Sequence, residues 1–189
     1  KQAGMSATAK HFPGHGAVGP DSHVAMPVDR RPLADMDQDL YPYQRLIDNG
    51  LASIMAAHVV FSEADRLPAG FSGRWLQQEL RGRLGFDGAI FSDDLSMAGA
   101  GVVGDMPERV RAALTAGCDI VLACNNRQGV LHVIESLRGT GDPLSHIRLA
   151  RLHGRQELTR TALRGSAHWQ ACEQAIRGSM ERPDLRLDA

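Results

Sequence analysis

Side chains capable of chemistry are concentrated in one short stretch, AKHFPGHGAVGPDSH, at residues 9–23. It holds one lysine, three histidines and one aspartate among glycines and prolines: Lys10, His11, His15, Asp21 and His23. Lys10 is one of only two lysines in a chain that otherwise uses arginine. Lysine offers three hydrogen-bond donors and neutral histidine offers a donor and an acceptor, so Lys10 and His11 could bind substrate hydroxyl groups. Alternatively, Lys10 is a buried lysine neutralised by a carboxylate such as Asp93.

The triplet Asp-Ser-His at residues 21–23 places an acid two residues from a histidine. A carboxylate bonded to one imidazole nitrogen fixes the tautomer and raises the basicity of the ring. The other nitrogen can then carry a proton to and from a substrate near neutral pH. The triplet therefore predicts a general acid/base, His23, with Asp21 as its partner. The alternative is an Asx-type turn with an exposed histidine.

The run FSDD at residues 91–94 ends an apolar segment with two adjacent carboxylates. Successive side chains of a strand point to opposite faces, so the two aspartates face different sides of a sheet. A carboxylate on the inner side can act as a nucleophile on an electrophilic carbon, and Asp93 is our candidate. The alternative is a helix N-cap, which suits Asp94, before LSMAGA, better than it suits Asp93.

A metal site is the competing interpretation of the histidines. His11 and His15 have the i, i+4 spacing that binds zinc on a helix, and more ligand types follow at residues 21–23. Pro13 and Gly14 fall between the two histidines, however, and prevent a helix there. We therefore predict no metal.

Four apolar, β-prone runs could position these groups: SATAKHF (6–12), ASIMAAHVVF (52–61), GAIFSDD (88–94) and CDIVLAC (118–124). None alternates cleanly between polar and apolar residues, which is typical of parallel strands covered on both faces. Polar residues stand near the end of every run: Lys10 and His11, then His58, then Asp93 and Asp94, then Asn125 and Asn126. In a TIM-type barrel the reacting groups come from the C-terminal ends of the strands.

Helical patterns with apolar stripes separate or follow these runs, at residues 37–50, 72–85, 106–117 and 129–139. Strands that alternate with helices favour a parallel sheet with crossover helices. We expect an α/β fold: the C-terminal half of a TIM-type (β/α)8 barrel, about four βα units, at residues 1–140. A C-terminal helical tail at residues 141–189 is expected to pack on the barrel. Because the chain opens close to its densest polar motif, we expect the N-terminal half of the same barrel as its partner.

The composition is that of a soluble globular protein, with 189 residues, 43% hydrophobic, 23% charged, and a formal net charge of −1. The arginines are scattered, so we expect no nucleic-acid partner. The longest apolar runs fall short of the roughly 20 residues that span a bilayer, so we expect no membrane partner. Cys118, Cys124 and Cys172 are expected to be reduced thiols.

Together the motifs resemble glycoside hydrolase family 3. The resemblance rests on KHFPGHG, DSH four residues later, GFDGAIFSDDLSM and AGCDIVLACNN, and it covers nearly the whole chain. Within the family, the motifs are most similar to those of bacterial cytoplasmic β-N-acetylglucosaminidases of cell-wall recycling.

The resemblance implies a retaining mechanism, with Asp93 as the nucleophile and His23 as the general acid/base assisted by Asp21. It implies that Lys10 and His11 bind the sugar and that no cofactor takes part. The expected activity is exo-acting release of terminal β-linked N-acetylglucosamine in the bacterial cytoplasm. The expected substrates are muropeptides, GlcNAc-1,6-anhydro-MurNAc with or without peptide, or chitobiose-like sugars.

Two alternatives remain open. One is a non-catalytic half-barrel that binds sugar or assembles with a partner. The other is a family 3 β-glucosidase of different specificity, which the DSH triplet disfavours because that triplet marks the hexosaminidase branch. Further sugar-binding residues of the family, an aspartate and arginines, belong to the half-barrel that this sequence lacks.

Overall fold

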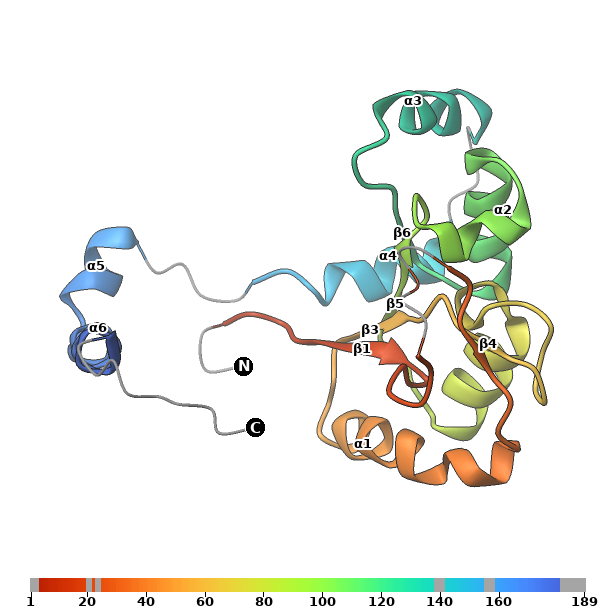
Figure 1. Cartoon of the computed structure of the whole chain (residues 1–189). Coiled ribbons are helices and arrows are strands. Elements are labelled where there is room, and N and C mark those ends of the chain that lie inside the picture. The colour runs from red at the N-terminus through yellow and green to blue at the C-terminus, as the bar shows by residue number, and fades with distance from the viewer. Residues whose placement is uncertain (1–3, 20–21, 23–24, 138–141, 155–158, 181–189) are drawn as a thin grey trace. The chain divides into compact units, whose positions relative to one another are not determined.

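The computed structural model describes residues 4–19, 22, 25–137, 142–154 and 159–180 (Figure 1). The chain divides into two compact units, Lys1–His153 and Gly154–Ala189. The first unit contains the sheet. The second contains α5 (Arg160–Gly165) and α6 (Ala167–Met180).

The first unit is built on a four-stranded parallel sheet with the strand order β1 (Thr8–Phe12), β3 (Ser53–Ala56), β5 (Ala89–Asp94) and β6 (Ile120–Leu122). This confirms the prediction of an α/β fold with one parallel strand in each of the four apolar runs. The second run differs in detail, because it contains β3 and also the short β4 (Val60–Phe61). After Ala57 bonds to β1, the chain turns at His58, and β4 pairs with β2 (Val28–Asp29).

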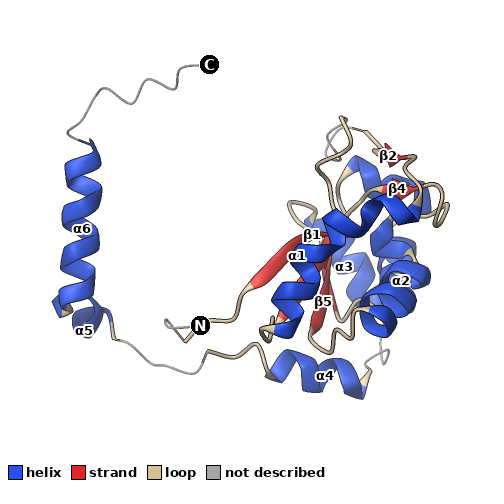
Figure 2. Cartoon of the chain, turned by 90° about the horizontal axis from the view of Figure 1, so that it is seen from below, coloured by secondary structure: helices blue, strands red, loops and turns tan. Residues whose placement is uncertain are grey.

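Helical segments connect the strands: η1 (Leu33–Met36), α1 (Asp37–Asp48), η2 (Ala69–Phe71), η3 (Arg74–Arg83), η4 (Ala98–Val103), α2 (Met106–Ala116), α3 (Arg127–Ser136) and α4 (Pro143–Ala150). All four helices predicted between the runs are present. The helix expected from residue 129 begins two residues earlier, because the Asn126 side chain accepts a hydrogen bond from the Gly129 N–H at 2.9 Å. Figure 2 shows the helices in blue beside the strands in red.

The residues expected to form a helical tail are divided between the two units. Helix α4 belongs to the first unit and packs against β5, whereas α5 and α6 belong to the second. The boundary proposed between residues 140 and 141 concerns the complete barrel and stays a prediction.

The strand register aligns side chains in rows that alternate between the two faces of the sheet: Ala9, Ile54 and Ile90, then Lys10, Met55, Phe91 and Ile120. In the first row Ile54 and Ile90 are fully buried. The second row is exposed or only partly buried. When a parallel sheet closes into a barrel, one of its faces turns toward the barrel axis. The incompletely covered face that carries the second row is the one we expect to face the axis.

A cluster of aromatic side chains packs around Phe12 at the end of β1. The Phe12 ring lies 5.2 Å from Tyr43 and 6.1 Å from Trp75, in edge-to-face geometry. Phe61 packs on the other side of Trp75 at 5.1 Å. Burying each of these side chains contributes about 1.5–3 kcal/mol, so α1, η3 and β4 are held firmly against the strand that carries Lys10.

A polar network closes the opposite end of the sheet around Asp119, whose side chain is 1% exposed. Its carboxylate accepts hydrogen bonds from Arg81 at 2.8 Å, the Ile90 N–H at 2.8 Å, Ser145 at 2.6 Å and Arg148 at 3.0 Å. These bonds fasten η3 and α4 to the beginnings of β5 and β6. The sequence analysis did not anticipate this network.

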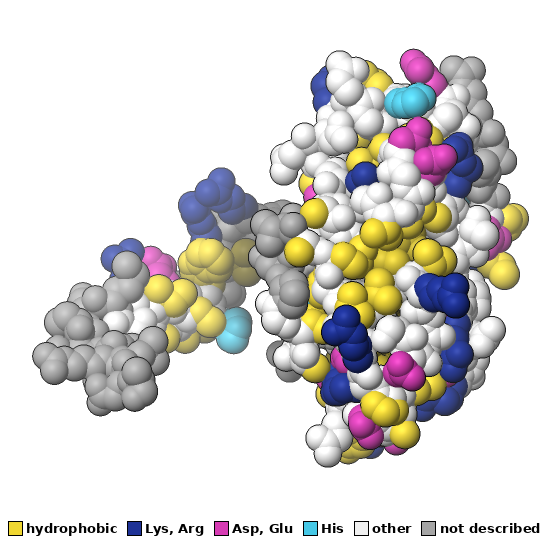
Figure 3. Space-filling view, turned by 45° about the vertical axis from the view of Figure 1, so that its right-hand side comes forward, with side chains coloured by type: hydrophobic (Ala, Val, Ile, Leu, Met, Phe, Trp, Pro, Cys, Tyr) yellow, Lys and Arg dark blue, Asp and Glu magenta, His cyan; other side chains and the backbone are white. Residues whose placement is uncertain are grey.

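The surface of the first unit mixes apolar and charged areas. Figure 3 shows one face, on which hydrophobic side chains form a yellow area bordered by Lys, Arg, Asp and Glu. Among the residues that the structure describes, no helix is both long enough and apolar enough to cross a membrane.

Candidate active site

Asp93 stands at the C-terminal end of β5, where the register with β6 shifts between Phe91 and Asp94. Its side chain is 15% exposed. One carboxylate oxygen accepts a hydrogen bond from the Asp94 N–H at 2.8 Å. The other lies 3.7 Å from His11 Nε2, which is too long for a hydrogen bond but close enough for electrostatic attraction to a protonated ring.

Asp94 has a structural task. Its carboxylate accepts hydrogen bonds from the Ser96 N–H and the Cys124 N–H, both at 2.9 Å. These bonds cap the turn after β5 and tie it to the end of β6. Asp94 thus caps the turn, but it is not the predicted helix N-cap, because Met97 stands at the N-cap of the next helical segment. Asp93 remains the candidate for chemistry.

Lys10 and His11 stand at the end of β1, where the register with β3 shifts between Lys10 and Phe12. The Lys10–His11 and Phe12–Pro13 peptide bonds are both cis. Lys10 is exposed, so the alternative in which it is a buried lysine neutralised by Asp93 is wrong for this chain. His11 is 31% exposed and reaches Asp93 from the far side of β3.

The acid/base candidates Asp21 and His23 lie outside the described residues, so their pairing stays a prediction. The residue between them, Ser22, is described and is 4% exposed. Its carbonyl accepts a hydrogen bond from the Gly99 N–H at 3.1 Å. Its hydroxyl lies 3.3 Å from His15 Nε2. Ser22 itself is therefore anchored to Gly99 and His15.

The His15 ring also lies near His11, with 6.4 Å between ring centroids in an edge-on arrangement. The residues expected to bind sugar and the DSH triplet are thus connected through His15. The sequence had offered His15 only as a metal ligand. Within the described part of the chain, no three His, Cys, Asp or Glu side chains are grouped so as to hold a metal ion.

His58 is a buried neighbour of the site to which the sequence analysis gave no role. It is 0% exposed, stacks on Phe71 with 5.4 Å between ring centroids, and has Nε2 3.1 Å from the Asp94 carbonyl. Burial lowers the pKa of His58, although the charges of Asp93 and Asp94 oppose the shift. A carbonyl can only accept, so neutral His58 carries its proton on Nε2 and donates it there.

A second buried group, Asp29, supports the loop that follows β1. Arg31 binds Asp29 at 2.7 Å and Asp39 at 2.9 Å. Burial raises the pKa of Asp29, but the hydrogen bonds and charge of Arg31 outweigh it and hold that pKa below its ordinary value. Asp39 also packs against Gly14, where an added Cβ would lie 3.2 Å from its carboxylate. Arg31 thereby links the base of the loop to α1.

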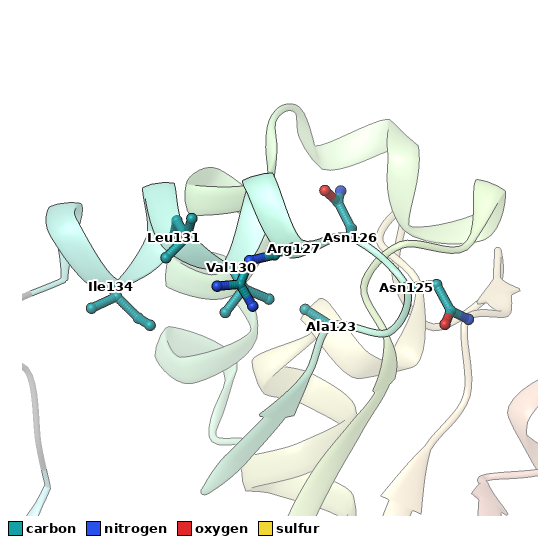
Figure 4. A pocket seen from close by; sticks show the side chains of 7 residues that line it. All are labelled: Ala123, Asn125, Asn126, Arg127, Val130, Leu131 and Ile134. Carbon is teal, nitrogen blue, oxygen red and sulfur yellow. The ribbon is translucent and has the colours of Figure 1, made fainter.

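The end of β6 borders a hollow of about 610 Å³ between that strand and α3 (Figure 4). Asn125 and Asn126 lie at one end, and Ala123, Arg127 and the apolar side chains of α3 line the rest. Leu131 and Ile134 are 43% and 62% exposed. The hollow is apolar over most of its length, and no aspartate, glutamate or histidine lines it.

Comparison with known proteins identifies the family and the fold. Residues 1–152 match the glycosyl hydrolase family 3 N-terminal domain. The chain belongs to glycosyl hydrolase family 3. Its fold is an α/β fragment with a parallel sheet, corresponding to the TIM-barrel-like N-terminal domain of this family.

Several family 3 relatives are similar over the whole chain. A β-hexosaminidase of Thioalkalivibrio sulfidiphilus is 53% identical over 100% of this chain and 54% of its own length. A β-hexosaminidase of Thiobacillus denitrificans is 50% identical over 100% of this chain and 53% of its own length. The chain thus spans about half the length of the curated relatives it matches.

Solved family 3 structures show the same fold. NagZ from Neisseria gonorrhoeae, in complex with N-trifluoroacetyl-D-glucosamine, has a TM-score of 0.81 and 39% identity, over 93% of this chain and 51% of its own. A family 3 β-N-acetylglucosaminidase from Paenibacillus has a TM-score of 0.74 and 28% identity, over 93% of this chain and 37% of its own.

Proposed function

We propose that the protein to which this chain belongs is a retaining exo-β-N-acetylglucosaminidase. The observation that carries the proposal is the position of Asp93, a partly exposed carboxylate beside His11 at the C-terminal ends of parallel strands. This is the edge at which barrels of this type place their reacting groups. The relatives named β-hexosaminidase support the same reaction class.

In the first step Asp93 attacks the anomeric carbon, and the bond between that carbon and the leaving oxygen breaks. His23 donates its proton to the leaving oxygen. In the second step His23 removes a proton from water, which attacks the anomeric carbon and releases Asp93. Two inversions give net retention, with a histidine in the place where most retaining enzymes use a second carboxylate. Asp21 holds the His23 ring in the required tautomer.

Lys10 and His11 bind sugar hydroxyl groups in this proposal. Lys10 is exposed in the same row as Phe91, and His11 lies beside Asp93. A sugar bound at this edge of the sheet would therefore contact Lys10, His11 and Asp93. The Asp94 carboxylate already accepts hydrogen bonds from the Ser96 N–H and the Cys124 N–H, which favours Asp93 over Asp94 as the nucleophile.

The N-terminal half of the same barrel is the proposed partner. Within the described residues, β1 pairs only with β3 and β6 pairs only with β5, so each leaves one strand edge open. The apolar hollow beside β6 and α3 offers a seat for an additional βα unit. A chain half as long as its relatives leaves room for the four strands that would close the barrel.

The proposed substrate class is terminal β-linked N-acetylglucosamine on peptidoglycan fragments, cleaved in the bacterial cytoplasm during cell-wall recycling. The 2-acylamino sugar bound by the gonococcal relative supports recognition of the N-acetyl group. A preference for aryl β-glucoside over aryl N-acetyl-β-glucosaminide would instead favour the β-glucosidase alternative.

Covalent labelling tests the nucleophile. A 5-fluoro glycosyl inactivator that carries the 2-acetamido group should trap the glycosyl-enzyme of the whole protein, with the label on Asp93 in peptide mapping. Asp94, the neighbouring carboxylate, is the internal control. A label on Asp94, or on no carboxylate, would contradict the proposal.

Leaving-group dependence tests His23, because acid assistance matters most when the leaving group is poor. General acid catalysis contributes about 10²–10⁴-fold, so His23→Ala should lose that much kcat/KM on a disaccharide. An aryl glycoside with an activated leaving group should lose far less. Equal losses on both substrates would show that His23 is structural.

A further inference from the structure

Two segments that are far apart in the sequence meet at one backbone hydrogen bond. Gly99 lies in η4, directly after the turn that follows Asp93 and Asp94. Its N–H donates to the Ser22 carbonyl at 3.1 Å. Both residues are buried. This bond joins the DSH triplet to the segment that carries the proposed nucleophile.

Glycine is required at this contact by its surroundings. A Cβ built on Gly99 would lie 3.1 Å from His58 Cβ, 3.2 Å from the Ser22 carbonyl oxygen and 3.3 Å from the His58 carbonyl oxygen. Two of these three atoms belong to the backbone, which cannot rotate away as a flexible side chain can. A larger residue at this position therefore has to move Ser22, His58 or both.

His58 continues the connection to β5. Its ring is held by Phe71 on one face, and its Nε2–H donates to the Asp94 carbonyl at 3.1 Å. The Asp94 N–H in turn donates to the Asp93 carboxylate at 2.8 Å. An unbroken series of contacts thus runs from Ser22 through Gly99 and His58 to the reacting carboxylate.

We propose that Ser22, Gly99 and His58 form a positioning bridge that sets the distance between the acid/base segment and the nucleophile. None of the three needs to touch the substrate. The inference rests on the proposed function, because it takes Asp93 as the nucleophile and the residue after Ser22 as the acid/base. The glycosylation step needs both groups at one glycosidic bond, so an error of about 1 Å in this distance can cost about 10²-fold.

Gly99→Ala in the whole protein tests the bridge, and Gly101→Ala is its matched control in the same helix. At Gly101 an added Cβ lies 3.7 Å from the Arg109 guanidinium, which is ordinary van der Waals contact. We expect Gly99→Ala to lower kcat/KM for a disaccharide by up to about 10-fold, because the neighbouring atoms must move by a few tenths of an ångström. The loss for an activated aryl glycoside should be much smaller, and Gly101→Ala should behave as wild type on both.

Hydrogen exchange provides a second readout that does not depend on turnover. The Gly99 amide of the wild type should exchange slowly, and Gly99→Ala should speed exchange in the segment at residues 95–105 while Gly101→Ala does not. Because the wild-type measurement needs no variant, it holds even where Gly99→Ala fails to fold. Exchange of the wild-type Gly99 amide at the rate of an unprotected peptide would overturn the bridge.

The kinetic outcomes separate the remaining cases. Equal losses on the two glycosides, or no loss on either, would overturn the positioning role. Hydrolysis of neither glycoside by the wild type would overturn the proposed function instead, and hydrogen exchange alone would then decide whether the bridge exists.

Discussion

The two ends of the parallel sheet each carry a prominent aspartate, and the two carboxylates are treated in opposite ways. Asp119, before β6, is 1% exposed and accepts four hydrogen bonds, two of them from arginines. Asp93, at the end of β5, is 15% exposed, and the structure gives it one backbone hydrogen bond and a 3.7 Å approach to His11. The Asp119 carboxylate is saturated with hydrogen bonds, whereas the Asp93 carboxylate can still accept further partners.

The difference shows how the sheet separates stability from chemistry. A buried carboxylate with every oxygen paired fixes the elements around it, but it cannot attack a substrate without losing those bonds. A carboxylate with spare capacity contributes less to stability and remains available as a nucleophile. The N-terminal ends of the strands therefore carry the structural polar network, and the C-terminal ends carry the groups that we propose to react.

The contrast between the Asp119 network and the Asp93 site is tested most severely by studying this chain without the proposed N-terminal half of the barrel. The Asp119 network lies within the described residues, whereas in the same residues the two outer strands of the sheet each have one unpaired edge. We predict that residues 1–189 alone have no measurable hexosaminidase activity and are aggregation-prone or partly molten. Adding the N-terminal half, in cis or as a second chain, should restore turnover of an aryl N-acetyl-β-glucosaminide. A monomeric, sharply folded and active 1–189 would refute the half-barrel interpretation.

Replacing the reactive carboxylate should abolish catalysis and leave the fold intact. Asp93→Asn in the whole protein should lower kcat by roughly 10⁴-fold, the size of loss seen when one member of a catalytic set is removed. Its unfolding temperature should stay close to that of the wild type, because only the Asp94 N–H bond and the 3.7 Å approach of His11 lose the charge. A large fall in unfolding temperature would mean that Asp93, like Asp119, is structural.

Replacing the saturated carboxylate should do the reverse. Asp119→Ala leaves Arg81 and Arg148 without their shared acceptor, and their side chains are only 12% and 16% exposed. Breaking a buried ion pair from one side costs about 3–5 kcal/mol of unfolding free energy. The matched control is Asp142→Ala, which removes only the N-cap of α4 and should cost about 1 kcal/mol.

Denaturant unfolding of the whole protein measures both changes, and kcat per folded molecule should stay near the wild-type value. Equal costs for the two variants would show that the Asp119 network adds little beyond a helix cap.

Acid should weaken the reactive end through His58. Burial lowers the pKa of His58 in the folded protein, so on acidification His58 binds a proton more readily in the unfolded chain than in the folded protein. This contribution to stability is complete above about pH 6.5, the unperturbed value for histidine, and is lost as the pH falls below it. His58→Asn should remove up to about 1.4 kcal/mol per pH unit of that slope.

His132→Asn, on an exposed residue of α3, is the control for the His58 measurement and should keep the wild-type slope. An unchanged slope in His58→Asn would show that the acid sensitivity arises elsewhere.

The sequence was informative about everything that depends on local pattern. The apolar runs predicted the four strands of the main sheet, and polar residues at their ends predicted the edge of the sheet at which Asp93 and His11 lie. Their meeting requires β1 and β5 to flank β3, which follows from parallel strands with crossover helices. The sequence also predicted a capping role for Asp94, because its side chain needs only neighbours close to the strand ends.

What escaped prediction depends on residues far apart in the chain. Asp119 finds Arg81 and Arg148 at sequence separations of 38 and 29 residues, and no local pattern marks either pairing. Gly99 resembles any glycine of a turn until the fold brings Ser22 and His58 against it. The π-helical winding of η3 was equally invisible, because its apolar stripe also fits an α-helix.

The burial of Cys118 has a practical consequence. Burial raises the pKa of its thiol to about 12, so almost none of it is thiolate at neutral pH, and only a thiolate reacts with alkylating agents. Cys124 and Cys172 are exposed, which lets them consume a first dose of reagent. The slower alkylation of Cys118 then measures how often the interior opens and exposes this thiol to solvent. The rate at which Cys118 is alkylated therefore reports transient unfolding, and mass spectrometry can measure it without an engineered label.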